Sequence, residues 1–176
     1  AALFVFQLIV LIFSVILHEV AHGVVAERLG DPTARLAGRL TLNPLPHLDL
    51  FGSIILPILL AIPAFFGQPT MIIGWAKPVP YNPNNLRDPV RGGALIALAG
   101  PLTNILVAAV FGLLVRGVAL FEVPVGETFI LLISVVISLN LLLAVFNLVP
   151  IPPLDGSKVL NLFLTARGRM AWGQFW

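Results

Sequence analysis

The sequence predicts an all-α membrane protein, with a core of three transmembrane helices and an insertion between the first two. Of its 176 residues, 59% are hydrophobic and 10% are charged, whereas a soluble domain carries about 25% charged residues. Three segments, 3–28, 93–116 and 128–146, are apolar over about the 20 residues that a helix needs to cross a bilayer. No linker-like stretch divides the chain, so we expect residues 1–176 to form one domain.

The first span, residues 3–28, is expected to be retained as a transmembrane helix. Its apolar stretch from Leu3 to Leu17 follows no charged region and precedes no small-residue cleavage site, unlike a removable signal peptide. Charged residues and then Gly30 end the helix at the interface.

The insertion that follows is predicted to contain a short strand or β-hairpin and then a loop. An Asp31-Pro32 pair breaks the first helix, and leucines alternate with other residues through 36–42, which allows strand pairing. Residues 67–90 are rich in Pro, Gly and Asn, which is typical of loop.

The charges orient the three spans in the membrane. Loop 117–127 carries Glu122 and Glu127, with Arg116 at its border. By the positive-inside rule, residues 28–91 and the C-terminal tail are cytoplasmic and loop 117–127 is outside. This orientation rests on the cations that lie between the first two spans and after the third: Arg28, Arg35, Arg39, Lys77, Arg87, Arg91, Lys158, Arg167 and Arg169.

This topology decides how the apolar segment 52–73 can sit. Both of its flanks are cytoplasmic, so it cannot cross the membrane an odd number of times. It is also short and is interrupted by Pro57 and Pro63. We therefore predict a re-entrant or interfacial hairpin packed against the active-site helices, since broken backbone at that depth needs protein or water around it.

The run His18-Glu19-Val20-Ala21-His22 ends the first apolar span and predicts a metal site. An ionisable group at membrane depth costs about 2.5–3.5 kcal/mol on insertion scales, so three in five residues need a partner. Positions i and i+4 of a helix share a face, so His18 and His22 can bind one cation. Glu19 then lies beside the metal, placed to take a proton from a bound water. The pattern indicates a zinc hydrolase with its site inside the membrane.

Asp155 is the predicted third ligand, because a catalytic zinc needs three protein ligands and one open position. The chain has no cysteine, and the predicted topology brings the stretch that carries Asp155 to the same side as the two histidines. Prolines before Asp155 unwind the helix, and Gly156 permits unusual backbone geometry beside it. Alternatively, Asp155 could cap a helix that begins near Ser157.

The remaining polar residues of interest are assigned structural roles. His47 lies in a polar loop beside Asp49 and is not expected to bind the metal. Glu27 is expected at the membrane interface. Asn104 and Asn140 are interpreted as amides that help helices pack.

Three motifs together resemble the site-2 protease family of intramembrane zinc metalloproteases, in particular its compact prokaryotic branch without a PDZ domain. They are His18–His22, the segment Gly100-Pro101-Leu102-Thr103-Asn104, and Asn147 with the downstream Asp155-Gly156. The resemblance runs from about Leu3 to about Leu164. It departs at Leu148, where the family often has a proline.

The resemblance implies a role for each matching residue. His18, His22 and Asp155 would hold one Zn²⁺ per chain, and Glu19 would be the general base that activates a zinc-bound water. Asn147 would steady the substrate backbone or the oxyanion, and Asn104 would lie near the site. The family also has a three-helix core and an active site near the cytoplasmic face.

The function expected from these observations is zinc-dependent cleavage of peptide bonds in or near transmembrane segments of other membrane proteins. The lipid bilayer is the second expected partner, and the location is a prokaryotic cell membrane. A strand within 35–45 or 72–80 could hold the extended substrate by edge pairing. No basic tract with interleaved aromatics is present, which argues against nucleic acid. The alternative is a zinc-binding transporter or a non-catalytic scaffold, although we see no repeat between the halves.

Overall fold

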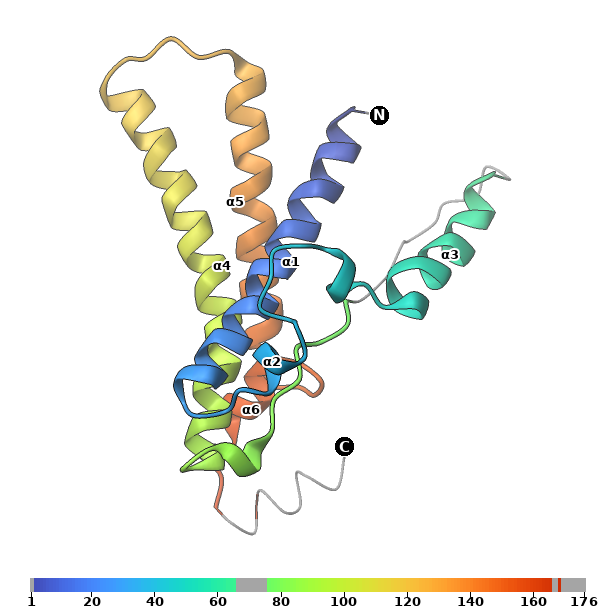
Figure 1. Cartoon of the computed structure of the whole chain (residues 1–176). Helices are drawn as coiled ribbons and strands as arrows, with labels where there is room; N and C mark the ends of the chain where they lie inside the picture. Colours follow the sequence, from blue (N-terminus) through green and yellow to red (C-terminus); the bar gives the residue numbers. More distant parts are fainter. Residues whose placement is uncertain (1, 66–75, 166–167, 169–176) are drawn as a thin grey trace.

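A computed structural model describes residues 2–65, 76–165 and 168 of the chain. Three long helices form a bundle: α1 (Ala2–Arg28), α4 (Pro89–Leu120) and α5 (Glu127–Leu148). As Figure 1 shows, they lie close together near α6 and spread apart toward the loop between α4 and α5. The shorter elements are α2 (Thr33–Leu36), η1 (Leu45–His47), the π-helix η2 (Leu50–Ile55), α3 (Leu56–Phe65), η3 (Pro83–Asn85) and α6 (Asp155–Leu160).

The three long helices are the predicted membrane spans. Their most apolar stretches have mean hydropathies of 2.4, 2.1 and 2.8, and each helix is long enough to cross a bilayer. The all-helical core predicted from the sequence is therefore confirmed. Each helix extends slightly beyond its predicted range, because the sequence estimate counted only the apolar residues.

Helix α4 is the central member of the bundle, since it packs against both α1 and α5. Its start is set by Asp88, whose carboxylate accepts hydrogen bonds from the backbone N–H groups of Val90 and Arg91 at 3.0 Å each. Small residues let neighbouring helices approach closely. Those buried on α4 are Gly92, Gly93, Ala94, Ala97, Ala99, Gly100 and Ala108.

The predicted strand or hairpin through 36–42 is wrong, and the described residues contain no strand. The chain forms the short helix α2 and then turns, with Gly38 at a positive φ of 66°. Leu36 is 80% exposed, whereas Arg39 is only 5% exposed. The alternating pattern misled because Arg39 is buried while Leu36 and Leu42 are exposed; of the three leucines, Leu40 packs against α1, at Gly23.

The re-entrant hairpin predicted for 52–73 is not supported either. Its described part belongs to one continuous helical stretch, η2 and α3, and residues 66–73 lie outside the described residues. The Asp49 carboxylate caps the start by accepting a hydrogen bond from Gly52 N at 2.6 Å. Pro63 lies inside α3 without ending it. Helix α3 packs mainly on η2 and extends away from the bundle rather than against it (Figure 1).

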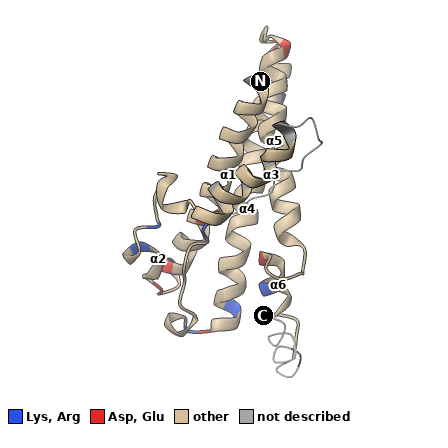
Figure 2. Cartoon of the chain, turned by 90° about the vertical axis from the view of Figure 1, so that its right-hand side faces the viewer, with Lys and Arg blue, Asp and Glu red and all other residues tan. Residues whose placement is uncertain are grey.

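Most of the charged residues lie toward the end of the bundle that carries α2 and α6 (Figure 2). The opposite end carries the loop between α4 and α5, with Glu122 and Glu127. Helix α2 and the segment after α5 therefore lie toward the same end of the bundle, as the charge pattern predicts, whereas α3 lies beside its middle (Figures 1 and 2).

Candidate metal centre

Three metal-ligating side chains from distant parts of the sequence meet at one point. His18 and His22 lie one turn apart on α1, and Asp155 is the first residue of α6. The Asp155 Oδ2 atom is 3.0 Å from His18 Nε2 and 3.2 Å from His22 Nε2. The ligating atoms of all three residues lie within 4.8 Å of one another. The structure thus brings together the three residues that the sequence nominates as ligands.

Each imidazole is held in place by a hydrogen bond at Nδ1, the ring nitrogen that does not contact Asp155. His18 Nδ1 donates to Asn104 Oδ1, and His22 Nδ1 donates to the backbone carbonyl of Ile96, both at 2.6 Å. A carbonyl oxygen only accepts, so both Nδ1 atoms carry the proton and a neutral ring points its Nε2 lone pair at Asp155. Such partners fix the tautomer and ring orientation of metal-binding histidines.

The chemistry of this donor set fits a cation. Two Nε2 lone pairs and a carboxylate oxygen about 3 Å apart repel one another unless positive charge lies among them. When protons on the imidazoles supply that charge, the pKa of Asp155 is lowered below its usual range, although burial alone would raise it. Ligands about 2.0–2.1 Å from a tetrahedral zinc ion lie about 3.4 Å apart, close to these separations. Three N and O ligands also leave one coordination position open.

A buried polar network supports His18 from α4 and α5. Asn104 Nδ2 donates to Asn140 Oδ1, and Asn140 Nδ2 donates to Ser14 Oγ, both at 2.9 Å. Both asparagines are fully buried. The interpretation of Asn104 as only a packing amide is therefore incomplete, because it also orients a metal-site histidine. The signal in the sequence was an amide within an apolar span. Such an amide needs a hydrogen-bond partner, but the sequence does not reveal which residue that partner is.

Two glycines allow the close approaches that build the site. A Cβ at Gly100 would overlap the imidazole of His18, and a Cβ at Gly156 would overlap the carbonyl oxygens of Leu148 and Val149. Gly156 lets α6 begin directly against the end of α5. This close approach places Asp155, the first residue of α6, beside the histidines. The alternative role of Asp155 as a helix cap is wrong, since Leu154 is the N-cap of α6 and no side-chain cap is formed.

Glu19 and Asn147 line the same pocket as the three ligating residues, and the pocket has a volume of about 150 Å³. Glu19 Oε2 accepts a hydrogen bond from the backbone N–H of Val79 at 2.8 Å. Asn147 Nδ2 donates to Leu143 O of its own helix at 3.0 Å. His47 lies outside this pocket, where its Nε2 donates to Thr41 O at 2.9 Å. The pocket can hold several water molecules.

Comparison with known proteins places this geometry in a family. YwhC of Bacillus subtilis is 40% identical over 164 residues, which cover 89% of this chain and 68% of YwhC. The profile of Peptidase family M50 matches residues 117–174. The chain belongs to peptidase family M50, the site-2 protease family. This membership makes it a metalloprotease with zinc as its cofactor.

Other M50 relatives are longer than this chain. Rip2 of Mycolicibacterium smegmatis is 31% identical over 91% of this chain and 58% of its own length. Rip3 of Mycobacterium tuberculosis is 30% identical over 90% of this chain and 31% of its own length. The names of all three relatives describe candidate zinc metalloproteases. No solved structure matches the chain significantly.

The pocket is also lined by two polar side chains that the sequence did not nominate. Tyr81 and Lys158 both line it, and Lys158 Nζ lies 5.1 Å from the centre of the Tyr81 ring. Such a cation–π contact is favourable and holds the lysine at the pocket. A lone lysine after the third motif and a lone tyrosine in a loop carry no local pattern, so only the fold reveals them.

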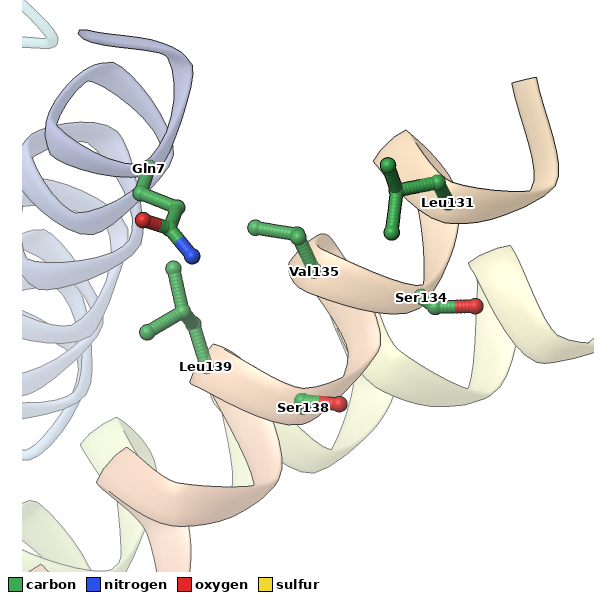
Figure 3. A pocket seen from close by; sticks show the side chains of 6 residues that line it. All are labelled: Gln7, Leu131, Ser134, Val135, Ser138 and Leu139. Atoms are coloured by element: carbon green, nitrogen blue, oxygen red, sulfur yellow. The ribbon is translucent and has the colours of Figure 1, made fainter. Parts of the chain in front are cut away.

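A second hollow lies far from these residues, between α1 and α5 (Figure 3). It is larger, at about 210 Å³, but none of its lining residues is titratable. In Figure 3 the Gln7 amide points toward Leu139 and Val135, whereas Ser134 and Ser138 point away from it. It therefore offers no group for metal binding or proton transfer, and the smaller pocket is the candidate site.

Proposed function

We propose that this M50 chain is a zinc-dependent intramembrane endopeptidase. The observation that carries the proposal is the convergence of His18, His22 and Asp155 beside Glu19, on helices long and apolar enough to span a membrane. A hydrolytic site on such helices acts on substrates that the bilayer itself presents. The proposed substrate is therefore a transmembrane segment of another membrane protein.

His18, His22 and Asp155 are the proposed zinc ligands. When bound there, zinc supplies Lewis acidity, which lowers the pKa of water to about 7 and polarises a carbonyl group. The chain's own contribution is to hold the two histidines in place, His18 through Asn104 and His22 through the Ile96 carbonyl. Their fixed orientation avoids reorganisation during the reaction.

Glu19 is the proposed general base. Its Oε2 is occupied by the Val79 N–H, and no hydrogen bond from a described residue occupies Oε1. One carboxylate oxygen therefore anchors the side chain and leaves the other to accept a proton from water. The same oxygen then passes that proton to the leaving amine of the cleaved peptide.

Asn147 is the proposed donor to the substrate carbonyl or the oxyanion. Its amide has two N–H groups, and one is used by the Leu143 carbonyl. The other N–H remains for the substrate, on a side chain that already lines the pocket. A neutral donor in this position stabilises negative charge that develops on a carbonyl oxygen.

Edge pairing of the substrate on a strand is not part of this proposal. Residues 35–45 form helix, turns and bends, and residues 72–75 lie outside the described residues. In 76–80, four backbone groups are already engaged. Lys77 N donates to His47 O, and the Lys77 and Pro78 carbonyls accept from Arg39. The Val79 N–H is bound to Glu19. These two stretches therefore contain no strand among their described residues that could offer an edge to a peptide.

The charge distribution supports a cytoplasmic position for the site. The pocket lies at the end of the bundle that carries α2 and α6, where most of the charged residues are found (Figure 2). Positive charge beside membrane spans marks the cytoplasmic side. The protein is accordingly proposed to reside in a prokaryotic cell membrane, with water reaching the site from the cytoplasm.

The deciding experiment is cleavage of single-span reporter proteins in liposomes by the native chain and by Glu19→Gln, with bound zinc quantified in both. We expect equal zinc content, and cleavage by the native chain only. Zinc bound by both proteins with cleavage by neither would contradict the protease proposal and favour a transporter or scaffold.

A further inference from the structure

Arg39 is a buried cation that has no carboxylate partner among the described residues. Its side chain follows α2, is 5% exposed, and forms no ion pair within the described part of the chain. Its guanidinium instead donates to three backbone carbonyls, those of Pro46, Lys77 and Pro78. A buried charge is costly unless its hydrogen bonds are well satisfied. Its position therefore calls for a structural or functional explanation.

One peptide group connects Arg39 to the proposed general base. Arg39 Nη2 donates to Pro78 O at 3.1 Å, and the N–H of the same peptide group, on Val79, donates to Glu19 Oε2 at 2.8 Å. The peptide group is planar and rigid, so fixing its oxygen also fixes the direction of its N–H. A cation at the oxygen and a carboxylate at the N–H polarise the group in the same sense and strengthen both bonds.

The surrounding loop holds this peptide group in place. Lys77 N donates to His47 O at 2.9 Å, so Arg39 and His47 hold the same segment from one side. Prolines at 78 and 80 restrict the backbone on either side of Val79. The Val79 side chain is itself buried, at 8% exposure. The segment is therefore prepared to present its N–H to Glu19.

We propose that Arg39 is a positioning residue for Glu19, acting through the Pro78–Val79 peptide group. It holds the Val79 N–H on Glu19 Oε2 and so keeps Oε1 directed to the pocket. The guanidinium suits this role because Nη2 donates to the Lys77 and Pro78 carbonyls while Nη1 donates to Pro46 O, so its rigid plane is fixed at both nitrogens. This inference rests on the proposed function of Glu19 and extends it to a residue outside the pocket lining.

The kinetic test compares Arg39→Met and Arg39→Lys with a matched control, Arg35→Met. Arg35 is an exposed arginine nearby that pairs with Glu27 at 2.9 Å. For Arg39→Met we expect kcat to fall by about 10- to 100-fold, which is less than the full contribution of a general base, about 10²- to 10⁴-fold, because Glu19 is still present. KM and zinc content should be nearly unchanged. Arg39→Lys should restore part of kcat, and Arg35→Met should behave as the native chain. An unchanged kcat, or a loss that follows zinc content, overturns the proposal.

A double-mutant cycle tests whether Arg39 acts through the peptide group. Val79→Pro deletes the N–H, whereas Val79→Ala keeps it and controls for the lost side chain. We expect Val79→Pro to lower kcat more than Val79→Ala, and Arg39→Met to add little in the Val79→Pro background. Residues that act through one contact are non-additive. Fully additive losses mean that Arg39 acts by another route.

A spectroscopic readout separates this inference from the protease proposal. In zinc-loaded protein labelled with [¹⁵N]valine, the Val79 amide proton resonance reports its hydrogen bond. We expect Glu19→Gln and Arg39→Met each to shift it upfield, and Arg35→Met to leave it in place. A Val79 resonance that moves in Glu19→Gln but not in Arg39→Met overturns the inference. If both variants move it while the native chain cuts no reporter, the positioning contact stands and the protease proposal fails.

Discussion

The Oδ1 atom of Asn104 on α4 accepts a hydrogen bond from His18 Nδ1 on α1 at 2.6 Å. This contact joins two membrane-spanning helices and also sets which imidazole nitrogen faces Asp155. Helix packing and the orientation of a proposed zinc ligand are therefore coupled in this protein, because the Asn104 side chain serves both.

Replacing Asn104 with alanine should lower zinc affinity by about 10- to 100-fold, the usual effect of losing the partner behind a metal-binding histidine. The His18 ring would lose its fixed tautomer and orientation. Competition with a zinc-chelating dye measures the affinity. Asn140→Ala is the matched control, since Asn140 contacts Asn104 but not His18. Equal zinc affinity of Asn104→Ala and the native chain would contradict this role.

Gly100→Ala should displace the His18 ring and reduce both zinc content and cleavage. The added Cβ would overlap the imidazole, which cannot retreat without losing its contact with Asn104. Gly112→Ala lies on the same helix with open space around the position, so it should be neutral or slightly stabilising. Similar zinc content in the two variants would show that the ring has room to move.

Asp31 should make the folded state sensitive to acid. Its carboxylate is fully buried and accepts hydrogen bonds from Thr33, Asn85 Nδ2 and the Asn82 N–H. Burial raises the pKa of Asp31, but these hydrogen bonds outweigh it and lower the pKa below its usual value. The stabilisation is therefore complete above the usual aspartate pKa of about 3.9 and disappears as the pH falls through the lowered value.

The unfolding temperature in detergent between pH 7 and pH 3 checks this expectation. Asp31→Asn should be less stable than the native chain at pH 7, and the difference should narrow on acidification. Parallel pH profiles for the two proteins would show that Asp31 does not contribute in this way.

Removing zinc with a chelator should abolish cleavage and lower the unfolding temperature. A ligand that binds only the folded state stabilises that state. Without zinc, the acceptor atoms of His18, His22 and Asp155 would face one another with no positive charge between them. Glu19→Gln should show the same zinc-dependent shift in unfolding temperature, because Glu19 is not a proposed ligand. A shift that is absent from the native chain, or fully present in Asp155→Ala, would argue against this ligand set.

The fold was predictable where local pattern decides it. Apolar runs of membrane length marked α1, α4 and α5, and charges beside them indicated which segments share an end. The strand predicted from the alternating leucines through 36–42 was wrong, because an alternating hydrophobic pattern does not by itself show which residues are buried. There the buried residue is Arg39, and two of the three carbonyls that it binds, those of Lys77 and Pro78, lie almost 40 positions along the chain.

The sequence alone nominated His18, Glu19 and His22, since helical periodicity places i and i+4 on one face regardless of the rest of the protein. It also pointed to Asp155 through topology and a proline-broken segment. Only the tertiary structure decided which groups orient them. Asn104 behind His18, Gly100 against its ring, and the Arg39-held peptide on Glu19 are contacts between residues tens of positions apart. Such contacts depend on how helices pack and where a loop returns, and no local sequence pattern encodes either.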